Sequence, residues 1–264
     1  MKILYIGDIV ARIGRRAVQQ VLPELRQEKQ IEFVIAQSEN MSTGNGITTK
    51  AVNEMREAGV DFFTGGNHSF KKPEGVELMM DPKNNIIRPA NYPGKTPGRG
   101  WAIAETPFGK ILIINLLGQL FNGPQLDHPL KVIDIILEDN KDEKLVATIV
   151  DFHGDLTSEK VGIGFYLEGR VSAAVGSHIH VSTADARVLP GGTAHITDVG
   201  MTGPVDSILG VKKDIILERW LNQLPNKFEN PTTGMVQFSS VLIDVDRNGK
   251  ATSIEQILRQ VEVN

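Results

Sequence analysis

The chain has 264 residues, of which 41% are hydrophobic and 23% are charged, so it can bury a sizeable core and has the composition of a soluble globular protein. Its net charge of −4 offers no basic surface, which argues against binding to a nucleic-acid duplex or to an anionic membrane. The chain has no cysteine, and this excludes disulfide bonds, zinc–thiolate sites and thiol nucleophiles.

The start of the chain shows no targeting signal. The apolar run between Met1 and Asp8 is too short for a signal peptide, and no run approaches the roughly 20 apolar residues that cross a bilayer. We therefore expect a cytoplasmic protein without a membrane partner. The oligomeric state stays open, with a homo-oligomer among the alternatives.

Short apolar runs alternate with longer amphipathic segments through the first two thirds of the chain. The apolar runs predict strands at residues 3–6, 33–36, 62–64, 111–115, 146–150 and 173–175. Helical spacing predicts helices at residues 16–29, 48–58, 73–80, 129–140 and 158–168. Pro23 lies inside the first helix and is expected to kink or divide it. Residues 83–100, rich in Pro, Gly and Asn, are interpreted as a surface loop.

Hairpin signals become frequent later in the chain. Turn residues separate segments 101–106 and 110–115, segments 187–189 and 193–197, and segments 236–245 and 251–257. A further helix is predicted at residues 212–223. Parallel units followed by antiparallel strands indicate an α/β protein built as a four-layer α/β/β/α sandwich, with residues 1–264 forming a single domain.

Polar residues follow five of the predicted strands directly. Ligands of open α/β sheets bind beyond the carboxyl ends of the strands, so these residues are expected to converge. The candidates are Asp8, Glu39, Asn40, Asn67, His68, His153, His178 and His180. Together they supply enough oxygen and imidazole ligands for two metal ions.

Each candidate also has a simpler interpretation. Asp8 could cap the following helix, Asn67 and His68 could form a turn, and His153 could be a core histidine with satisfied hydrogen bonds. Glu39 favours a metal role, because an unpaired carboxylate at the end of a buried strand loses its solvation.

The other histidines and the glycine-rich segment are easier to assign to the site or to exclude from it. His178 and His180 are alternate residues just past a strand and can both face one ligand, whereas His128 and His195 are given no role. The glycine-rich residues 42–46 do not match a phosphate-binding P-loop and are interpreted as a loop near the site. No Gly-x-Ser-x-Gly elbow is present, so a serine hydrolase has little support.

The order of these residues resembles that of the calcineurin-like metallophosphoesterases over nearly the whole chain. Segments 7–10 (GDIV), 38–40 (SEN), 65–68 (GGNH) and 197–204 (TDVGMTGP) resemble more narrowly a bacterial branch, the 2′,3′-cyclic-nucleotide 2′-phosphodiesterases. The chain departs from the wider superfamily at Val10, where a histidine is usual, and at Glu39 and Ser69, where aspartate and an acidic residue are usual.

The resemblance implies a ligand set. Two metal ions, iron first and manganese as the alternative, would share Glu39. One ion would be held by Asp8, Asn40 and His180, and the other by Asn67, His153 and His178. His68 would hold no metal and would face the substrate.

The expected reaction is hydrolysis of a phosphodiester. Two divalent ions less the two carboxylates leave a charge of about +2, which attracts phosphate and lowers the pKa of bound water. A hydroxide bridging the metals would attack phosphorus, and His68 would act as general acid toward the leaving ribose oxygen. The expected substrates are 2′,3′-cyclic nucleotides, with 3′,5′-cyclic nucleotides as a second candidate.

Two other functions stay open. The same chemistry suits a phosphomonoesterase or nucleotidase, and the site could serve a nucleotide-sensing regulatory protein whose turnover is incidental. Substrate-binding residues are not assigned, and Phe70 and Phe121 are the only aromatic candidates for contact with a base.

Overall fold

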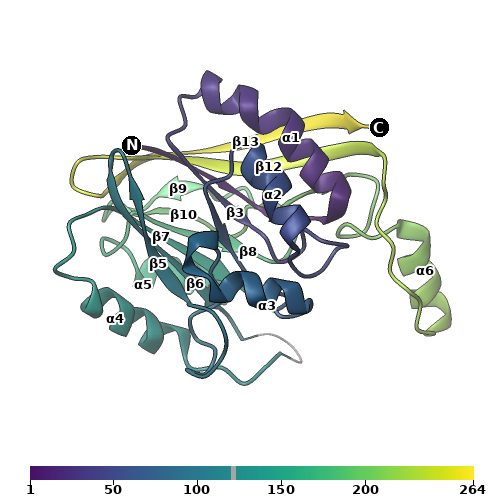
Figure 1. Cartoon of the computed structure of the whole chain (residues 1–264), viewed down its shortest axis with the longest axis horizontal. Helices are drawn as coiled ribbons and strands as arrows, with labels where there is room; N and C mark the ends of the chain where they lie inside the picture. Colours follow the sequence, from purple (N-terminus) through teal and green to yellow (C-terminus); the bar gives the residue numbers. More distant parts are fainter. Residues whose placement is uncertain (120–122) are drawn as a thin grey trace.

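Two β-sheets pack face to face and carry helices on their outer faces (Figure 1). The computed structural model describes residues 1–119 and 123–264. Alternate residues of the first strand show how the layers form: Ile3 and Tyr5 face the second sheet, whereas Leu4 and Ile6 face the helices. The expected four-layer α/β/β/α arrangement is confirmed.

The first sheet has the order β2-β11-β12-β1-β3-β4, with β13 also paired to β12. Its strands are β1 (Lys2–Ile6), β2 (Asp8–Ile9), β3 (Phe33–Gln37), β4 (Phe62–Thr64), β11 (Met201–Pro204), β12 (Gly234–Val245) and β13 (Ala251–Val263). β1, β3 and β4 run parallel, so their carboxyl ends lie at one edge.

The second sheet has the order β5-β6-β7-β8-β10-β9. Its strands are β5 (Trp101–Thr106), β6 (Gly109–Leu117), β7 (Leu145–His153), β8 (Ala173–Ser177), β9 (Arg187–Val188) and β10 (Ala194–Ile196). β6, β7, β8 and β10 are parallel, and all three predicted hairpins are present, as β5–β6, β9–β10 and β12–β13.

The helices cover both outer faces. They are α1 (Ala11–Glu28), α2 (Thr49–Glu57), α3 (Pro73–Met80), α4 (Pro129–Asp139), α5 (Thr157–Tyr166) and α6 (Lys213–Asn222). Residues of α1, α2 and α3 pack on the first sheet, and residues of α4 and α5 pack on the second. α6 projects from the edge of the molecule (Figure 1). None of the described helices combines the length and apolarity needed to cross a bilayer.

Two expectations were wrong in detail, and two short strands were not expected. Pro23 does not divide α1, which begins five residues earlier than expected and runs unbroken past an exposed proline. Residues 86–89 and Asn91 are buried rather than on the surface, because Ile86 bridges to Phe63 at the sheet edge and the Asn91 side chain bonds to Leu117. β2 and β11 were not expected at all.

Candidate metal centre

The predicted ligands come from both sheets and meet where the carboxyl ends of the strands adjoin. Asp8 opens β2, Glu39 and Asn40 follow β3, Asn67 and His68 follow β4, His153 ends β7, and His178 and His180 follow β8. Asp8, Glu39 and His153 are fully buried. The parallel strands explain this convergence, because each delivers its following loop to the same edge.

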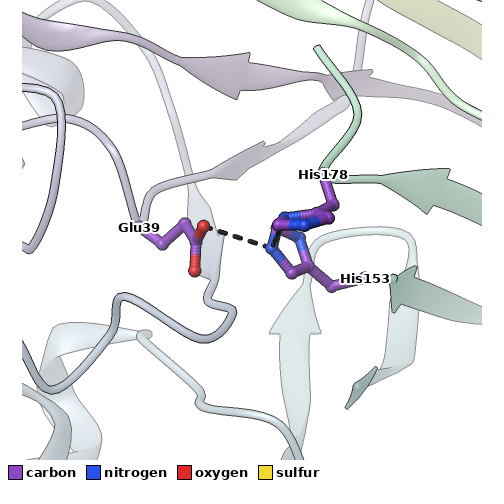
Figure 2. A group of neighbouring side chains, drawn as sticks. All are labelled: Glu39, His153 and His178. Carbon is purple, nitrogen blue, oxygen red and sulfur yellow. Dashed lines mark hydrogen bonds and ion pairs between the residues drawn. The ribbon is translucent and has the colours of Figure 1, made fainter. Parts of the chain in front are cut away.

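One set of predicted ligands surrounds His153 Nε2. This nitrogen lies 3.1 Å from Glu39 Oε1, 3.1 Å from Asn67 Oδ1 and 2.9 Å from His178 Nδ1. Figure 2 shows the Glu39 carboxylate and the two imidazole rings turned toward one another, and ligand atoms of these three residues lie within 4.8 Å of each other.

These separations fit a metal ion. Ligand atoms bound at about 2.1 Å and at right angles to each other lie about 3 Å apart, which is the spacing seen here. The pKa values of these residues reflect the same close approach of charges. Burial alone would lower the pKa of His153, but the Glu39, Asp8 and Asp151 carboxylates outweigh burial and raise the pKa to about 9. Burial would raise the pKa of Glu39, yet His153 and His68 lower it to about 2. The surrounding carboxylates thus favour a positive charge at His153.

The other nitrogen of His153 is held by a buried chain of hydrogen bonds. His153 Nδ1 lies 2.8 Å from Ser177 Oγ, which donates to Asp151 Oδ1 at 2.7 Å. Burial is the largest influence on Asp151 and raises its pKa to about 6. Because Ser177 donates to the carboxylate, its oxygen can accept from His153 Nδ1–H, and Gln37 Nε2 also lies 3.2 Å from this nitrogen. With Nδ1 protonated, Nε2 has the free lone pair that a metal requires.

His178 is positioned in a similar way. Its Nδ1 faces His153, and its Nε2 lies 2.8 Å from Asp155 Oδ1. Its backbone has φ of 104° and donates from N–H to Asp8 Oδ2 at 3.0 Å. Burial lowers the pKa of His178, and the neighbouring His153 lowers it further, so the neutral ring that a metal requires is favoured.

A second set of ligands surrounds Asp8 Oδ1. This oxygen is buried and has no hydrogen-bond partner in the described part of the chain, and it lies 3.8 Å from His180 Nε2. A buried, unpartnered carboxylate oxygen is costly unless a cation accompanies it. The Leu209 carbonyl accepts from His180 Nδ1 at 3.0 Å, which directs the lone pair of Nε2 toward Asp8.

Asn40 joins this second set to His68. Its Oδ1 lies 3.0 Å from His68 Nδ1, and its Nδ2 lies 3.1 Å from His180 Nε2. Ligation through Oδ1 beside His180 would need the amide turned over, which exchanges two atoms of similar size at nearly the same positions. Asp8 and Asn40 thus both lie next to His180 Nε2.

Gly66 leaves the room that the first cluster needs. A Cβ at this position would lie 2.2 Å from Glu39 Oε2 and 2.5 Å from His153 Nε2. The neighbouring Ser69, at one of the positions that departs from the wider superfamily, accepts at Oγ from Gly66 N–H at 2.8 Å. Ser69 therefore fixes the turn rather than joining the cluster.

His68 differs from the buried histidines. Its side chain is 34% exposed, its N–H donates to Glu39 Oε2 at 2.7 Å, and its Nδ1 is taken by Asn40. The ring is therefore anchored at Nδ1 while Nε2 is left to act toward the pocket that His68 lines.

A pocket of about 580 Å³ opens above the cluster. Its lining includes Glu39, Asn40, His68, Asp155, His178 and His180, together with Thr43, Gly44, Asn45, Lys71, Ile179, Leu209, Val211, Phe228 and Asn230. Loop 43–45 is thus at the site, as expected. Lys71, Phe228 and Asn230 were missed, because a lone lysine or phenylalanine in a loop carries no motif.

The two aromatic candidates did not provide a wall to this pocket. Phe70 packs edge-on against Tyr92, with ring centroids 5.0 Å apart, and is not among the lining residues. Phe121 lies outside the described residues. His128 caps α4, accepting from Leu130 N–H at 3.3 Å, and His195 is buried in β10, away from the pocket lining.

The sequence model of one protein family, described as YmdB-like protein, matches residues 4–257. The chain belongs to the YmdB-like family. A curated relative from Bacillus subtilis, named 2′,3′-cyclic-nucleotide 2′-phosphodiesterase, is 42% identical over 98% of this chain and 97% of its own length. The expected branch of the metallophosphoesterases is therefore confirmed.

Solved structures agree with this YmdB-like assignment. A hypothetical protein from Thermus thermophilus is 36% identical with a TM-score of 0.91, covering 98% of this chain and 99% of that chain. A phosphatase from Mycoplasma pneumoniae is 31% identical with a TM-score of 0.92, covering 100% of this chain and 94% of that chain. The fold of this YmdB-like chain is thus shared over its whole length.

Proposed function

We propose that the chain is a metal-dependent phosphodiesterase that opens the 2′,3′-cyclic phosphate of nucleotides at the 2′ oxygen and leaves a 3′-phosphate. The observation that carries the proposal is the convergence of Glu39, Asn67 and His178 on His153 Nε2, beneath a pocket lined by His68. The name of the Bacillus subtilis relative supports the substrate class. The cytoplasmic location expected from the sequence is part of this proposal.

Two metal ions sharing Glu39 fit the two ligand sets. His153, His178 and Asn67 would hold one ion, and Asp8, Asn40 and His180 the other. Iron or manganese suits this mixture of carboxylate, amide and imidazole ligands. When bound, such a pair supplies a hydroxide at neutral pH and neutralises charge on the phosphate.

His68 would transfer the proton that the leaving oxygen needs. Its Nδ1 contact with Asn40, at 3.0 Å, orients the ring, and Nε2 is the atom that would donate into the pocket. A five-membered cyclic phosphate is strained and opens readily, whereas a 3′,5′-cyclic phosphate lacks that strain. We therefore include 3′,5′-cyclic nucleotides as a slower second substrate that depends more strongly on His68.

Elemental analysis of protein purified without added metal, combined with product identification from 2′,3′-cyclic AMP, tests the proposal. We expect two metal ions per chain and 3′-AMP formed over many turnovers. Faster hydrolysis of 3′-AMP than of the cyclic diester would indicate a nucleotidase. Saturable binding without repeated turnover would indicate a sensor, and full activity of metal-free protein would refute the metal centre.

A further inference from the structure

The segment between α6 and β12 places an aromatic ring at the pocket. Phe228 lines the pocket and is 50% exposed, although it belongs to a stretch far from every predicted ligand in the sequence. The Arg219 guanidinium lies over its ring at 5.0 Å from the centroid, which helps to hold the ring in place. Packing alone does not explain why this aromatic side chain lies half-exposed beside a cluster of polar residues.

This segment is tied to the metal centre through a short series of contacts. Asn230 Nδ2 donates to the Gly210 carbonyl at 2.8 Å, and the preceding Leu209 carbonyl accepts from His180 Nδ1 at 3.0 Å. Lys212 N–H also donates to the Glu229 carbonyl at 2.9 Å. The loop that orients the ligand His180 therefore also fixes the position of Phe228.

The pocket lining also includes a lysine, Lys71. Lys71 follows His68 through a turn in which its N–H donates to the His68 carbonyl at 3.0 Å, and its side chain is exposed. Within the described residues its ammonium group forms no ion pair. The pocket lining thus includes a cation, Lys71, three residues after His68, and an aromatic ring, Phe228.

Loop 43–45 lies against the segment that carries Phe228. Gly44 has φ of 82°, and a Cβ there would lie 2.8 Å from Asn230 Oδ1. The loop after β3 and the segment before β12 are therefore in close contact, and both line the pocket.

We propose that Phe228 is the platform on which the nucleobase of the substrate stacks while its phosphate lies between the ligand cluster and Lys71. The inference rests on the proposed function and names the nucleoside subsite of the same pocket. A phenylalanine ring offers no hydrogen bond, so stacking on it accepts any base. The site therefore takes nucleoside 2′,3′-cyclic phosphates with little preference among the four bases.

The test compares a substrate that has a base with one that has none. We would measure kcat and KM for 2′,3′-cyclic AMP and for glycerol 1,2-cyclic phosphate, using the metal-loaded wild type, Phe228→Ala, Phe228→Tyr and Leu224→Ala. Phe228→Ala is expected to raise KM for 2′,3′-cyclic AMP about tenfold and to leave KM for the glycerol compound nearly unchanged, because stacking on a base is lost. Phe228→Tyr keeps the ring, and Leu224→Ala removes an exposed apolar residue outside the pocket lining, so both should resemble the wild type.

Equal losses on both substrates, or no loss on either, would overturn the role of Phe228. Loss of an oligomer by Phe228→Ala in sedimentation, with equal effects on both substrates, would show that a second copy of the chain covers the ring instead. Calorimetric binding of 2′,3′-cyclic AMP separates the two proposals. Binding that weakens in Phe228→Ala without any turnover in the wild type would support the subsite and refute the enzyme, whereas no binding by the wild type would refute both.

Discussion

His68 differs from the other histidines at the pocket in being anchored at one nitrogen and exposed at the other side of its ring. As a general acid it is expected to contribute about 10²–10⁴-fold to turnover, so His68→Ala should lose that much kcat on 2′,3′-cyclic AMP. The variant should keep its metal, because His68 is outside both ligand sets. Bis(p-nitrophenyl) phosphate, whose leaving group needs little protonation, should restore part of the lost rate.

Steady-state kinetics with metal analysis of the same samples checks this prediction, and His128→Ala, which alters only the cap of α4, is its control. Loss of metal from His68→Ala would make the residue a ligand instead.

Ser177 acts on the cluster without reaching it. It stands between His153 Nδ1 and the Asp151 carboxylate, at 2.8 and 2.7 Å. Ser177→Ala removes the acceptor that fixes the ring, so metal affinity should fall about 10–100-fold. Competition with a chelator measures this. Ser172→Ala also removes a buried hydroxyl, but Ser172 lies just before the start of β8, so this variant should retain wild-type affinity. Equal affinities in the two variants would contradict the prediction.

At the level of single residues, the sequence predicts those site residues that follow the end of a strand. Glu39 and His178 each stand three residues after the end of an apolar run, so their convergence can be expected from the order of the residues alone. Phe228 could not be predicted in this way, because its place depends on hydrogen bonds of Asn230 and Lys212 to other loops. Such contacts between loops have no periodic pattern in the sequence.

The loop after β8 depends on a buried ion pair from another element. Lys160 Nζ on α5 lies 2.5 Å from Asp198 Oδ2, and both side chains are fully buried. Asp198 also accepts from the N–H of Ile179, between the two histidines that we propose as ligands, and from Gly200 N–H. Lys160→Met leaves an uncompensated buried carboxylate and should cost about 3–5 kcal/mol of the free energy of unfolding.

Urea unfolding measures this loss. Lys213→Met, which breaks an exposed ion pair with Asp206, should change the free energy of unfolding by less than about 1 kcal/mol. Similar stabilities for the two variants would show that the buried pair adds nothing.

At the level of elements, long regular segments were predictable and short ones were not. Each strand with a wholly apolar run was found near its expected place, whereas β2 has only two residues and β11 begins at Met201 after a glycine, Gly200, with positive φ. Neither strand has a hydrophobic pattern long enough to be recognised in the sequence. Residues 83–100 are rich in Pro, Gly and Asn and look loop-like, but tertiary contacts of Ile86 and Asn91 bury residues 86–89 and Asn91.

For the whole molecule, His195 predicts a sensitivity to acid. It is 1% exposed, its Nδ1 donates to the Ala174 carbonyl at 2.8 Å, and burial lowers its pKa. A histidine in the unfolded chain has a pKa of about 6.5. Above that pH the His195 ring is neutral in both the folded and the unfolded state, so it does not make the free energy of unfolding depend on pH. Below that pH the unfolded chain binds a proton that the folded chain resists, so stability falls as the pH falls.

Urea unfolding of the wild type and of His195→Gln between pH 7.5 and 5 tests this prediction. The wild type should lose additional stability below about pH 6.5, with a slope of at most about 1.4 kcal/mol per pH unit that the variant lacks. Parallel curves would show that His195 is protonated equally easily in the folded and unfolded chains.

The pairing of β1 with β12 has a consequence for biosynthesis. Residues 2–6 lie between β3 and β12, a strand that ends at Val245. The first strand to be synthesised therefore cannot pair along its second edge until β12, near the end of the chain, has been made. Asp8 likewise pairs with Met201. While the ribosome is still translating, the amino-terminal βα unit presents an open β-edge, and chaperone occupancy of nascent chains should persist until the final hairpin emerges.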